Sequence, residues 1–183
     1  MSFKRVFIIV PASVNTSPIK GAAALANSLS KFVPVTFVAL KSGKRDIHFL
    51  NKDIECVLFA NKDLWIKKLL LLRRLIKNSG TKGEVATISL GLSADFFNIF
   101  LKNIAITCAS VRGNLPVVYV HTYGFVGKFI AYAHLKSLKK ITCVVSMTHS
   151  MSIQVQKYIG HGSPVIGNFI DESRLASYQK KRS

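Results

Sequence analysis

The sequence predicts an α/β domain, a three-layer α/β/α sandwich with a mostly parallel sheet. Short apolar runs rich in branched side chains recur along the chain, and most are separated by stretches with apolar residues three or four apart. Strands that alternate with helices in this way form parallel sheets with helices on both faces. The 183 residues suffice for one such domain with a packed core and are too few for two ordinary ones.

The first strand is expected at residues 4–10, where a continuous apolar run is typical of a strand buried on both faces. A loop should follow and end at Gly21. The helix after this loop is expected to have one apolar face, formed by Ala22, Leu25, Leu29 and Phe32. Residues 34–40 and 54–59 are again short apolar runs and predict the second and third strands.

The middle of the chain continues the alternation. Asn61 is expected to cap a helix that runs to about Asn78. Residues 85–90 predict a fourth strand, and Ser93 is expected to cap the next helix, whose phenylalanines should lie in the core. Residues 104–111 predict a fifth strand.

The last third is expected to contain a long helix, a strand and a second helix. The long helix should cover about 123–139. Its inner face is expected to comprise Val126, Phe129, Ile130, Ala133 and Leu138. Residues 141–146 predict a sixth strand, a helix from Thr148 to Ile159 follows, and 164–170 form a final apolar stretch. Ligands of such sheets bind beyond the carboxyl ends of the strands, so the loops after the strands are the expected site.

The charge of the chain limits its partners. Lys and Arg number 26 against 8 Asp and Glu, a formal net charge of +18. A surface of this kind attracts polyanions, so nucleic acid, an anionic membrane face and phosphorylated ligands are the candidates. No apolar run approaches the roughly 20 residues of a membrane-spanning helix. The first apolar run ends at Pro11, which favours a cytosolic chain over the alternative of a secretion signal.

The three cysteines, Cys56, Cys108 and Cys143, lie within or beside apolar runs and far apart in the sequence. No metal-ligand spacing is present, so they predict reduced core thiols and no metal site.

Four segments, in order, resemble the retaining GT-B glycosyltransferases of the family-four type. They are SLGLSAD (89–95), ITCASVRGN (106–114), YGFVGKFIAYAHLKSLKKITCVVSMTHSM (123–151) and VIGNFIDESRL (165–175). The resemblance covers residues 84–175, and the first third of the chain follows the family more weakly.

The resemblance implies that residues 1–183 are the N-terminal, acceptor-side Rossmann-like lobe of a GT-B fold, with the C-terminal donor-binding lobe absent. It implies transfer of a sugar, with retention of configuration, from a UDP- or GDP-linked donor to a lipid-linked or glycan acceptor. The expected setting is bacterial surface polysaccharide assembly, and the only small molecule required besides the acceptor is the donor. The chain alone is expected to be inactive, because the second lobe of such enzymes supplies most donor contacts.

The loop after the fifth strand contains the principal candidate. Arg112 occupies the place of a catalytic-face residue of the family, where many members have a histidine. A guanidinium there is expected to hold a phosphate of the donor or of a lipid diphosphate through paired hydrogen bonds. The alternative is an ordinary surface arginine, but the adjoining Gly113 and Asn114 favour a ligand-binding loop.

Further candidates for substrate binding lie in the other loops. Gly21 resembles the family's glycine-rich turn, in which backbone amides approach the donor phosphates. The short polar side chains before it suit either sugar hydroxyls or simple turn formation. The expected substrate-binding residues are Asn15, Thr16, Ser17, Lys20, Gly21, Gly113, Asn114, His121, Tyr123, His149 and Asn168. His48, His134 and His161 lack such a context and are expected to be structural or exposed.

The helix expected after Asn61 combines apolar residues at helical spacing with many cations. A helix of this kind either lies in the plane of an anionic membrane or packs on a core with a charged outer face. Leu70 and Leu71 widen its apolar face and favour the membrane. The expected membrane-contacting residues are Trp65, Lys67, Lys68, Arg73, Arg74 and Lys77. The protein is therefore expected to be cytoplasmic and peripheral at the inner face of the cytoplasmic membrane.

Two alternatives remain. The chain is either a non-catalytic subunit that recruits a separate catalytic partner to the membrane, or, less favoured, an α/β domain that binds nucleic acid. The second rests on charge alone, because the basic residues are scattered and no nucleic-acid motif is present.

Overall fold

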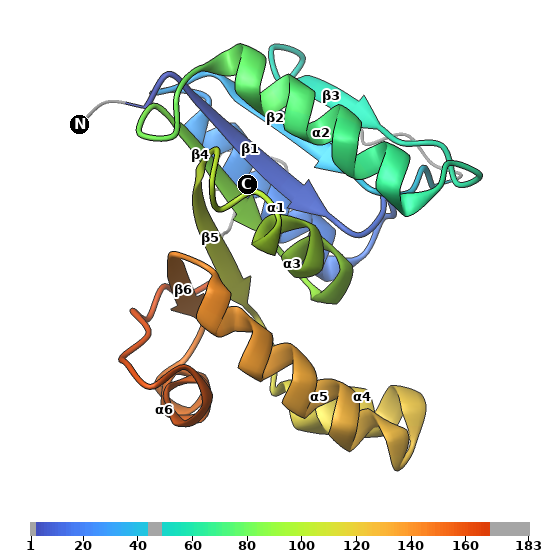
Figure 1. Ribbon diagram of the computed structural model, residues 1–183, viewed down its shortest axis with the longest axis vertical. Helices are drawn as coiled ribbons and strands as arrows, with labels where there is room; N and C mark the ends of the chain where they lie inside the picture. Colours follow the sequence, from blue (N-terminus) through green and yellow to red (C-terminus); the bar gives the residue numbers. More distant parts are fainter. Residues whose placement is uncertain (1–2, 44–48, 169–183) are drawn as a thin grey trace, which may run out of the picture.

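A computed structural model describes residues 3–43 and 49–168 and shows an α/β fold with a parallel sheet (Figure 1). The six strands follow the order β3-β2-β1-β4-β5-β6, and every pair is parallel. The strands are β1 (Arg5–Val10), β2 (Val35–Ala39), β3 (Glu55–Leu58), β4 (Val85–Ser89), β5 (Ile106–Val111) and β6 (Cys143–Ser146). The architecture confirms the predicted Rossmann-like three-layer sandwich.

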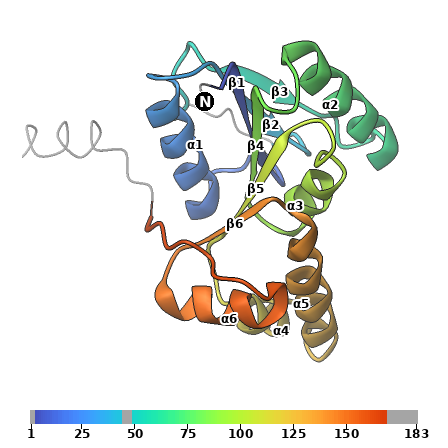
Figure 2. The same ribbon diagram turned by 60° about the vertical axis from the view of Figure 1, so that its left-hand side comes forward.

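Helices cover both faces of this sheet. They are α1 (Ser17–Leu29), α2 (Trp65–Ser79), α3 (Leu92–Ile99), α4 (Leu115–Tyr123), α5 (Val126–Ser137) and α6 (His149–Ile159), with a 3₁₀ turn, η1 (Leu138–Lys140), after α5. Figure 2 shows α1 on one side of the sheet and α2 and α3 on the other. No helix in the described ranges is long and apolar enough to cross a membrane.

The central strand β1 shows why the apolar runs are continuous. Its alternate residues Val6, Ile8 and Val10 pack against α1. Phe7 and Ile9 point to the opposite face and pack with α2 and α3. Because both faces of the strand are buried from Val6 onward, every position from Val6 to Val10 is apolar, as expected for the interior of a parallel sheet. A third core joins β5 and β6 to α5 and α6.

The strand order reverses direction between β1 and β4. The chain runs outward from β1 through β2 to β3, then returns to place β4 on the other side of β1. The connections from β1 and β4 therefore leave toward opposite faces, and a crevice opens at their carboxyl ends. This reversal determines where the site lies.

The first helix begins earlier than expected. α1 starts at Ser17 with Pro18 in its first turn, and Lys20 and Gly21 are helical. The expectation of a glycine-rich turn at Gly21 is therefore wrong. Proline is well suited to a first helical turn, because its φ is already helical and the N–H that it lacks has no partner there. Phe32 lies beyond the helix and is 86% exposed, so its predicted place on the buried face is also wrong.

Gly21→Ala is expected to stabilise the protein by about 0.5–1 kcal/mol, because alanine has the higher helix propensity. A methyl group at this position meets no atom within 4 Å. Urea denaturation measures the change. A loss of stability would contradict the helical assignment and favour the turn predicted from the sequence.

The predicted long helix is two helices. α4 ends at Tyr123 and α5 begins at Val126, separated by Gly124, whose φ of +60° is one that other residues adopt rarely. The predicted inner face is largely wrong: Val126, Phe129 and Ala133 are exposed, and Ile130 is half-buried. The residues buried on α5 are Gly127, Ala131, His134 and Leu135. The sequence prediction assigned the most apolar face of the helix to the core. In the structure, the buried face of α5 is the one that packs against α4 and the sheet.

Several boundaries differ in detail. α2 begins at Trp65, and Asn61 donates to the Ser42 carbonyl instead of capping it. Ser93 lies inside α3, because Gly91 is its N-cap.

The helix predicted from Thr148 to Ile159 is α6, and Thr148 is its N-cap, with Oγ1 accepting from the Met151 amide at 3.3 Å. Of the final apolar stretch, Val165 bridges Ser146, while 169–170 lie outside the described residues. Cys56, predicted to be a core thiol, is exposed, and the other two cysteines are half-buried.

Candidate functional site

A pocket of about 420 Å³ lies at the carboxyl ends of β1, β4 and β5. Its walls come from the loop after β1, the start of α3, the loop after β5, and α4 and α5. Most of the lining is apolar, including Pro11, Leu90, Leu92 and Val118. The volume and the few polar groups among apolar walls are typical of a small-molecule site. The position is the one that the strand reversal predicts.

The first loop is tied down on one side of this pocket. Ser13 is buried, its amide donates to the Lys41 carbonyl at 3.0 Å, and its Oγ accepts from the Gly43 amide at 2.6 Å. A side chain at Gly43 would lie 1.9 Å from the Ser13 carbonyl oxygen, so glycine is required there. The wall that carries Thr16 is therefore held by the neighbouring loop after β2.

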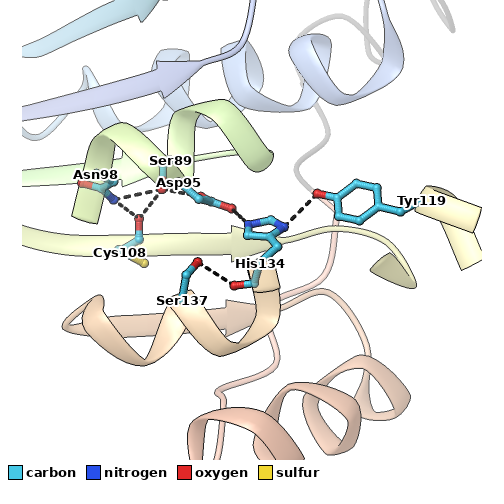
Figure 3. A network of polar contacts seen from close by, with 7 residues as sticks. All are labelled: Ser89, Asp95, Asn98, Cys108, Tyr119, His134 and Ser137. Carbon is cyan, nitrogen blue, oxygen red and sulfur yellow. Dashed lines mark hydrogen bonds and ion pairs between the residues drawn. The ribbon is translucent and has the colours of Figure 1, made fainter. Parts of the chain in front are cut away.

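A buried polar network contributes three side chains to the pocket lining, and Figure 3 shows its contacts. His134 Nε2 lies 2.9 Å from Asp95 Oδ2, and His134 Nδ1 lies 2.8 Å from the Tyr119 hydroxyl. The three side chains come from α5, α3 and α4, and each also lines the pocket. All three residues are less than 9% exposed. The network is therefore shielded from bulk water but accessible to a ligand in the pocket.

Ser89 and Asn98 extend the network into the sheet. Ser89 Oγ donates to Asp95 Oδ1 at 2.5 Å and accepts from Asn98 Nδ2 at 2.9 Å. Asn98 also donates to the Cys108 carbonyl at 2.8 Å, and its Oδ1 accepts from Thr87 Oγ1 at 2.5 Å. The side chains of Ser89 and Asn98 thus have hydrogen-bond partners. A satisfied buried network of this kind fixes the orientation of its side chains, here that of Asp95.

Burial controls ionisation around the pocket. Burial, and then the charge of Asp95, raises the pKa of Tyr119 well above its usual value, so the phenol stays protonated at neutral pH. Burial, and then the neighbouring Cys143, raises the pKa of the Cys108 thiol to about 12. Because the thiolate is the nucleophilic form, Cys108 is not a reactive cysteine.

Arg112 reaches the pocket from the end of β5. Its Nη2 donates to Asn168 Oδ1 at 2.5 Å, which brings together two residues that the sequence predicted for the site. Ser110 Oγ lies 3.5 Å from Nη1. Partial burial lowers the pKa of Arg112, but a guanidinium remains charged at neutral pH. A cation thus lines the same pocket as the Asp95–His134–Tyr119 network.

The other predicted site residues are divided by the fold. Thr16, Gly113 and Tyr123 line the pocket with Arg112. The remaining described candidates lie outside its lining: Asn15, Ser17, Lys20, Gly21, Asn114, His121, His149 and Asn168.

Three of these outlying residues have defined positions in the fold. Asn114 caps α4 and accepts from Gln154. His121 lies in the last turn of α4, not in a loop, and lines a second, open hollow of about 630 Å³ with Tyr132 and Tyr158. His149 is exposed at the first position of α6.

Sequence reasoning missed the network. His134 was expected to be structural or exposed, and Asp95 was treated only as part of a helix start. One signal was present: Asp95 is one of only 8 acidic residues and lies in the apolar stretch SADFFNIF. An isolated carboxylate in an apolar helix needs a buried partner. Nothing local shows that this partner is a histidine 39 positions later.

The predicted membrane helix changes in two respects. Lys68 is buried, and its Nζ donates to the Leu40 carbonyl at 2.7 Å, so its predicted membrane contact is wrong. Phe96 on α3 and Phe100 at its C-cap were expected in the core but are exposed, and both rings lie against Trp65. The three rings form an exposed aromatic cluster between α2 and α3. Arg73 donates to the Phe100 carbonyl at its edge.

Comparison with known proteins adds no assignment: neither a family model nor a curated protein matches this chain. In the described part of the chain, no group of three or more His, Cys, Asp or Glu side chains is arranged to hold a metal ion.

Proposed function

We propose that this domain is the acceptor-side lobe of a glycosyltransferase that moves a sugar from a UDP- or GDP-linked donor to a membrane-held acceptor. The observation that carries the proposal is the pocket at the strand reversal, where Arg112 and the Asp95–His134–Tyr119 network line one cavity. A cation suits a phosphate, and buried hydrogen-bonding groups suit sugar hydroxyls. The four resembling segments support the same assignment, and two of them contribute Asp95 and Arg112.

In this proposal the polar groups that line the pocket have different tasks. Arg112 holds a phosphate of the donor or of a lipid diphosphate, while Tyr119 meets a hydroxyl of the acceptor. The apolar walls exclude water from the space between them, which strengthens both interactions. A second lobe, in the same protein or in a partner subunit, closes the cleft and supplies the remaining donor contacts.

The test is transfer of labelled sugar from UDP- and GDP-sugars to a bacterial lipid extract, with the full natural protein and any partner subunit. Arg112→Lys keeps the charge but loses the paired geometry, and it should lower kcat/KM by about tenfold to a hundredfold. Lys82→Ala is the matched control, because Lys82 is an exposed cation remote from the pocket lining. Absence of labelled product with every donor would refute the proposed function.

Peripheral membrane attachment is the second part of the proposal. The exposed cluster of Trp65, Phe96 and Phe100 lies beside the exposed cations of α2, and the whole chain has a net charge of +18. Aromatic rings at the level of the lipid head groups, with cations around them, are typical of surfaces that lie on an anionic bilayer.

Removing two cations of this surface should weaken binding to phosphatidylglycerol vesicles. Lys67→Ala with Arg74→Ala is expected to lower the partition coefficient roughly 30-fold, since each cation near the surface contributes about 1 kcal/mol. Lys31→Ala with Lys52→Ala is the matched control: both lysines are exposed, and the segments beside them pack with the core under α1. Vesicle sedimentation measures both pairs. If both double variants lowered the partition coefficient equally, vesicle binding would depend on the total charge of the protein and not on the surface formed by α2.

A further inference from the structure

We propose that Tyr119, His134 and Asp95 form a proton relay, in which Tyr119 takes the proton of a hydroxyl bound in the pocket and passes its own proton to His134. Tyr119 is then the catalytic residue that touches the acceptor, and His134 and Asp95 act through it. The identity of the hydroxyl as a glycosyl acceptor rests on the proposed function. The direction of the relay rests on the hydrogen bonds of Asp95 and His134, with Asp95 ionised and His134 neutral.

The proton of Ser89 establishes this direction. Ser89 Oγ lies 2.5 Å from Asp95 Oδ1 and 3.3 Å from the Cys108 carbonyl, so its single proton belongs to the shorter bond. Asp95 therefore accepts on Oδ1 and, as a carboxylate, also accepts on Oδ2 from His134 Nε2 at 2.9 Å.

Neutral His134 carries one ring proton, and Asp95 holds it on Nε2. Nδ1 is then bare and accepts from the Tyr119 hydroxyl at 2.8 Å. Because Tyr119 donates its only hydroxyl proton in the hydrogen bond to His134, the lone pairs of its oxygen face the pocket that Tyr119 lines. The Tyr119 oxygen is therefore a hydrogen-bond acceptor for a ligand in the pocket. A ligand hydroxyl would donate its proton to this oxygen, and this is the proton that the reaction removes.

Burial determines how the proton passes. The raised pKa of Tyr119 opposes a free tyrosinate, so the two transfers occur together and no phenolate accumulates. The positive charge appears on His134, directly against the carboxylate of Asp95, and is neutralised there. The ring of Tyr119 stacks on the imidazole with centroids 5.9 Å apart, which holds the pair in this orientation.

The step is balanced in atoms and electrons. The acceptor O–H bond breaks as its proton joins Tyr119 Oη, and the Tyr119 O–H bond breaks as that proton joins His134 Nδ1. The acceptor oxygen forms the bond to the anomeric carbon of the nucleotide sugar. The bond from that carbon to the diphosphate breaks, and its electron pair leaves with the nucleoside diphosphate.

The substitution Asp95→Asn distinguishes a proton relay from a network that only stabilises the fold. The asparagine Oδ1 still accepts from Ser89, but its Nδ2 now donates to His134 Nε2. His134 must therefore carry its proton on Nδ1 and donate to Tyr119, which turns the phenol proton toward the pocket. Every hydrogen bond survives, so stability changes little, but His134 can no longer accept the proton.

The first measurement is ¹⁵N NMR of histidine-labelled protein at pH 7.5, without any ligand. The signals of His134 are those that vanish in His134→Asn. The expected result is a proton on Nε2 and a bare Nδ1 in the wild type, and the reverse in Asp95→Asn. A proton on Nδ1 of the wild type would overturn the relay, whatever reaction the protein performs.

The second measurement is kcat and KM for sugar transfer by the full natural protein. Tyr119→Phe and Asp95→Asn should each lower kcat by about a hundredfold to ten-thousandfold with little change in KM. Tyr132→Phe is the control, because this exposed tyrosine lies on α5 outside the pocket and bonds only Lys136 among the described residues. Near wild-type kcat in Asp95→Asn with a reversed tautomer would overturn the relay. No transfer by any variant or by the wild type would refute the proposed function, and the tautomer would still decide the relay.

Discussion

Asp95→Ala is expected to lower the free energy of unfolding by about 2–6 kcal/mol, because two buried groups donate to Asp95 and each buried donor that loses its partner costs about 1–3 kcal/mol. Asp95 is 1% exposed, and its carboxylate accepts from both Ser89 and His134. Alanine leaves His134 Nε2 without its partner and leaves Ser89 Oγ with only the longer contact of 3.3 Å to the Cys108 carbonyl, and a poorly satisfied buried group carries a desolvation penalty. Urea denaturation followed by circular dichroism measures the loss.

Asp63→Ala is the matched control for this substitution. Asp63 also accepts from a cation, Lys67 four residues later, but at the protein surface. Solvent screens such a pair, and its removal should change the midpoint hardly at all. If Asp95→Ala were as mild as Asp63→Ala, the network in Figure 3 would not be held together as a unit.

Gly127→Ala is the second substitution with a large expected effect, a loss of on the order of 3 kcal/mol. A methyl group at Gly127 would lie 2.0 Å from the carbonyl oxygen of Tyr119 and 2.6 Å from the amide nitrogen of Val120. These are backbone atoms of α4, which cannot rotate away as a side chain does. α4 and α5, which lie side by side in Figure 1, must therefore separate.

Separation of the two helices should also dismantle the relay, because Tyr119 belongs to α4 and His134 to α5. The imidazole ¹⁵N shifts of His134 are expected to change in Gly127→Ala even where the protein stays folded. Gly21→Ala is the matched control, with the same substitution inside a helix but open space around the methyl group. The two variants should change stability in opposite directions. A neutral Gly127→Ala would mean that α4 and α5 do not pack at this distance.

The core strands were predictable because their signal is local. A strand segment buried on both faces needs apolar side chains at every position, as from Val6 to Val10 of β1, and such a run is visible in a few neighbouring residues. The start of α6 near Thr148 was predictable for the same reason, since an N-cap and the amide that it binds lie within one helical turn. The location of the site beyond the strand ends follows from the parallel sheet itself.

The composition of the site was only partly predictable. Arg112 and Thr16 were found because they follow strands, and loops after strands line the crevice. The start of α1 was missed because a glycine was taken as a turn, although Pro18 permits a helix from Ser17. Gly21 and Gly127 are both single glycines inside helices, so their local sequences do not distinguish them. Only the close approach of α4 leaves no room for a side chain at Gly127.

The sequence by itself determined the alternation of strands and helices, the parallel sheet, the edge of the sheet at which the pocket lies, and the strongly basic charge. Tertiary structure alone decided that His134 is buried between Asp95 and Tyr119, that Lys68 turns inward, and that Phe96 and Phe100 turn outward. The physical reason is the distance along the sequence between the residues that interact. Periodicity records whether a segment has an apolar face, but which polar groups meet depends on partners brought together from α3, α4 and α5 by the packing of whole helices.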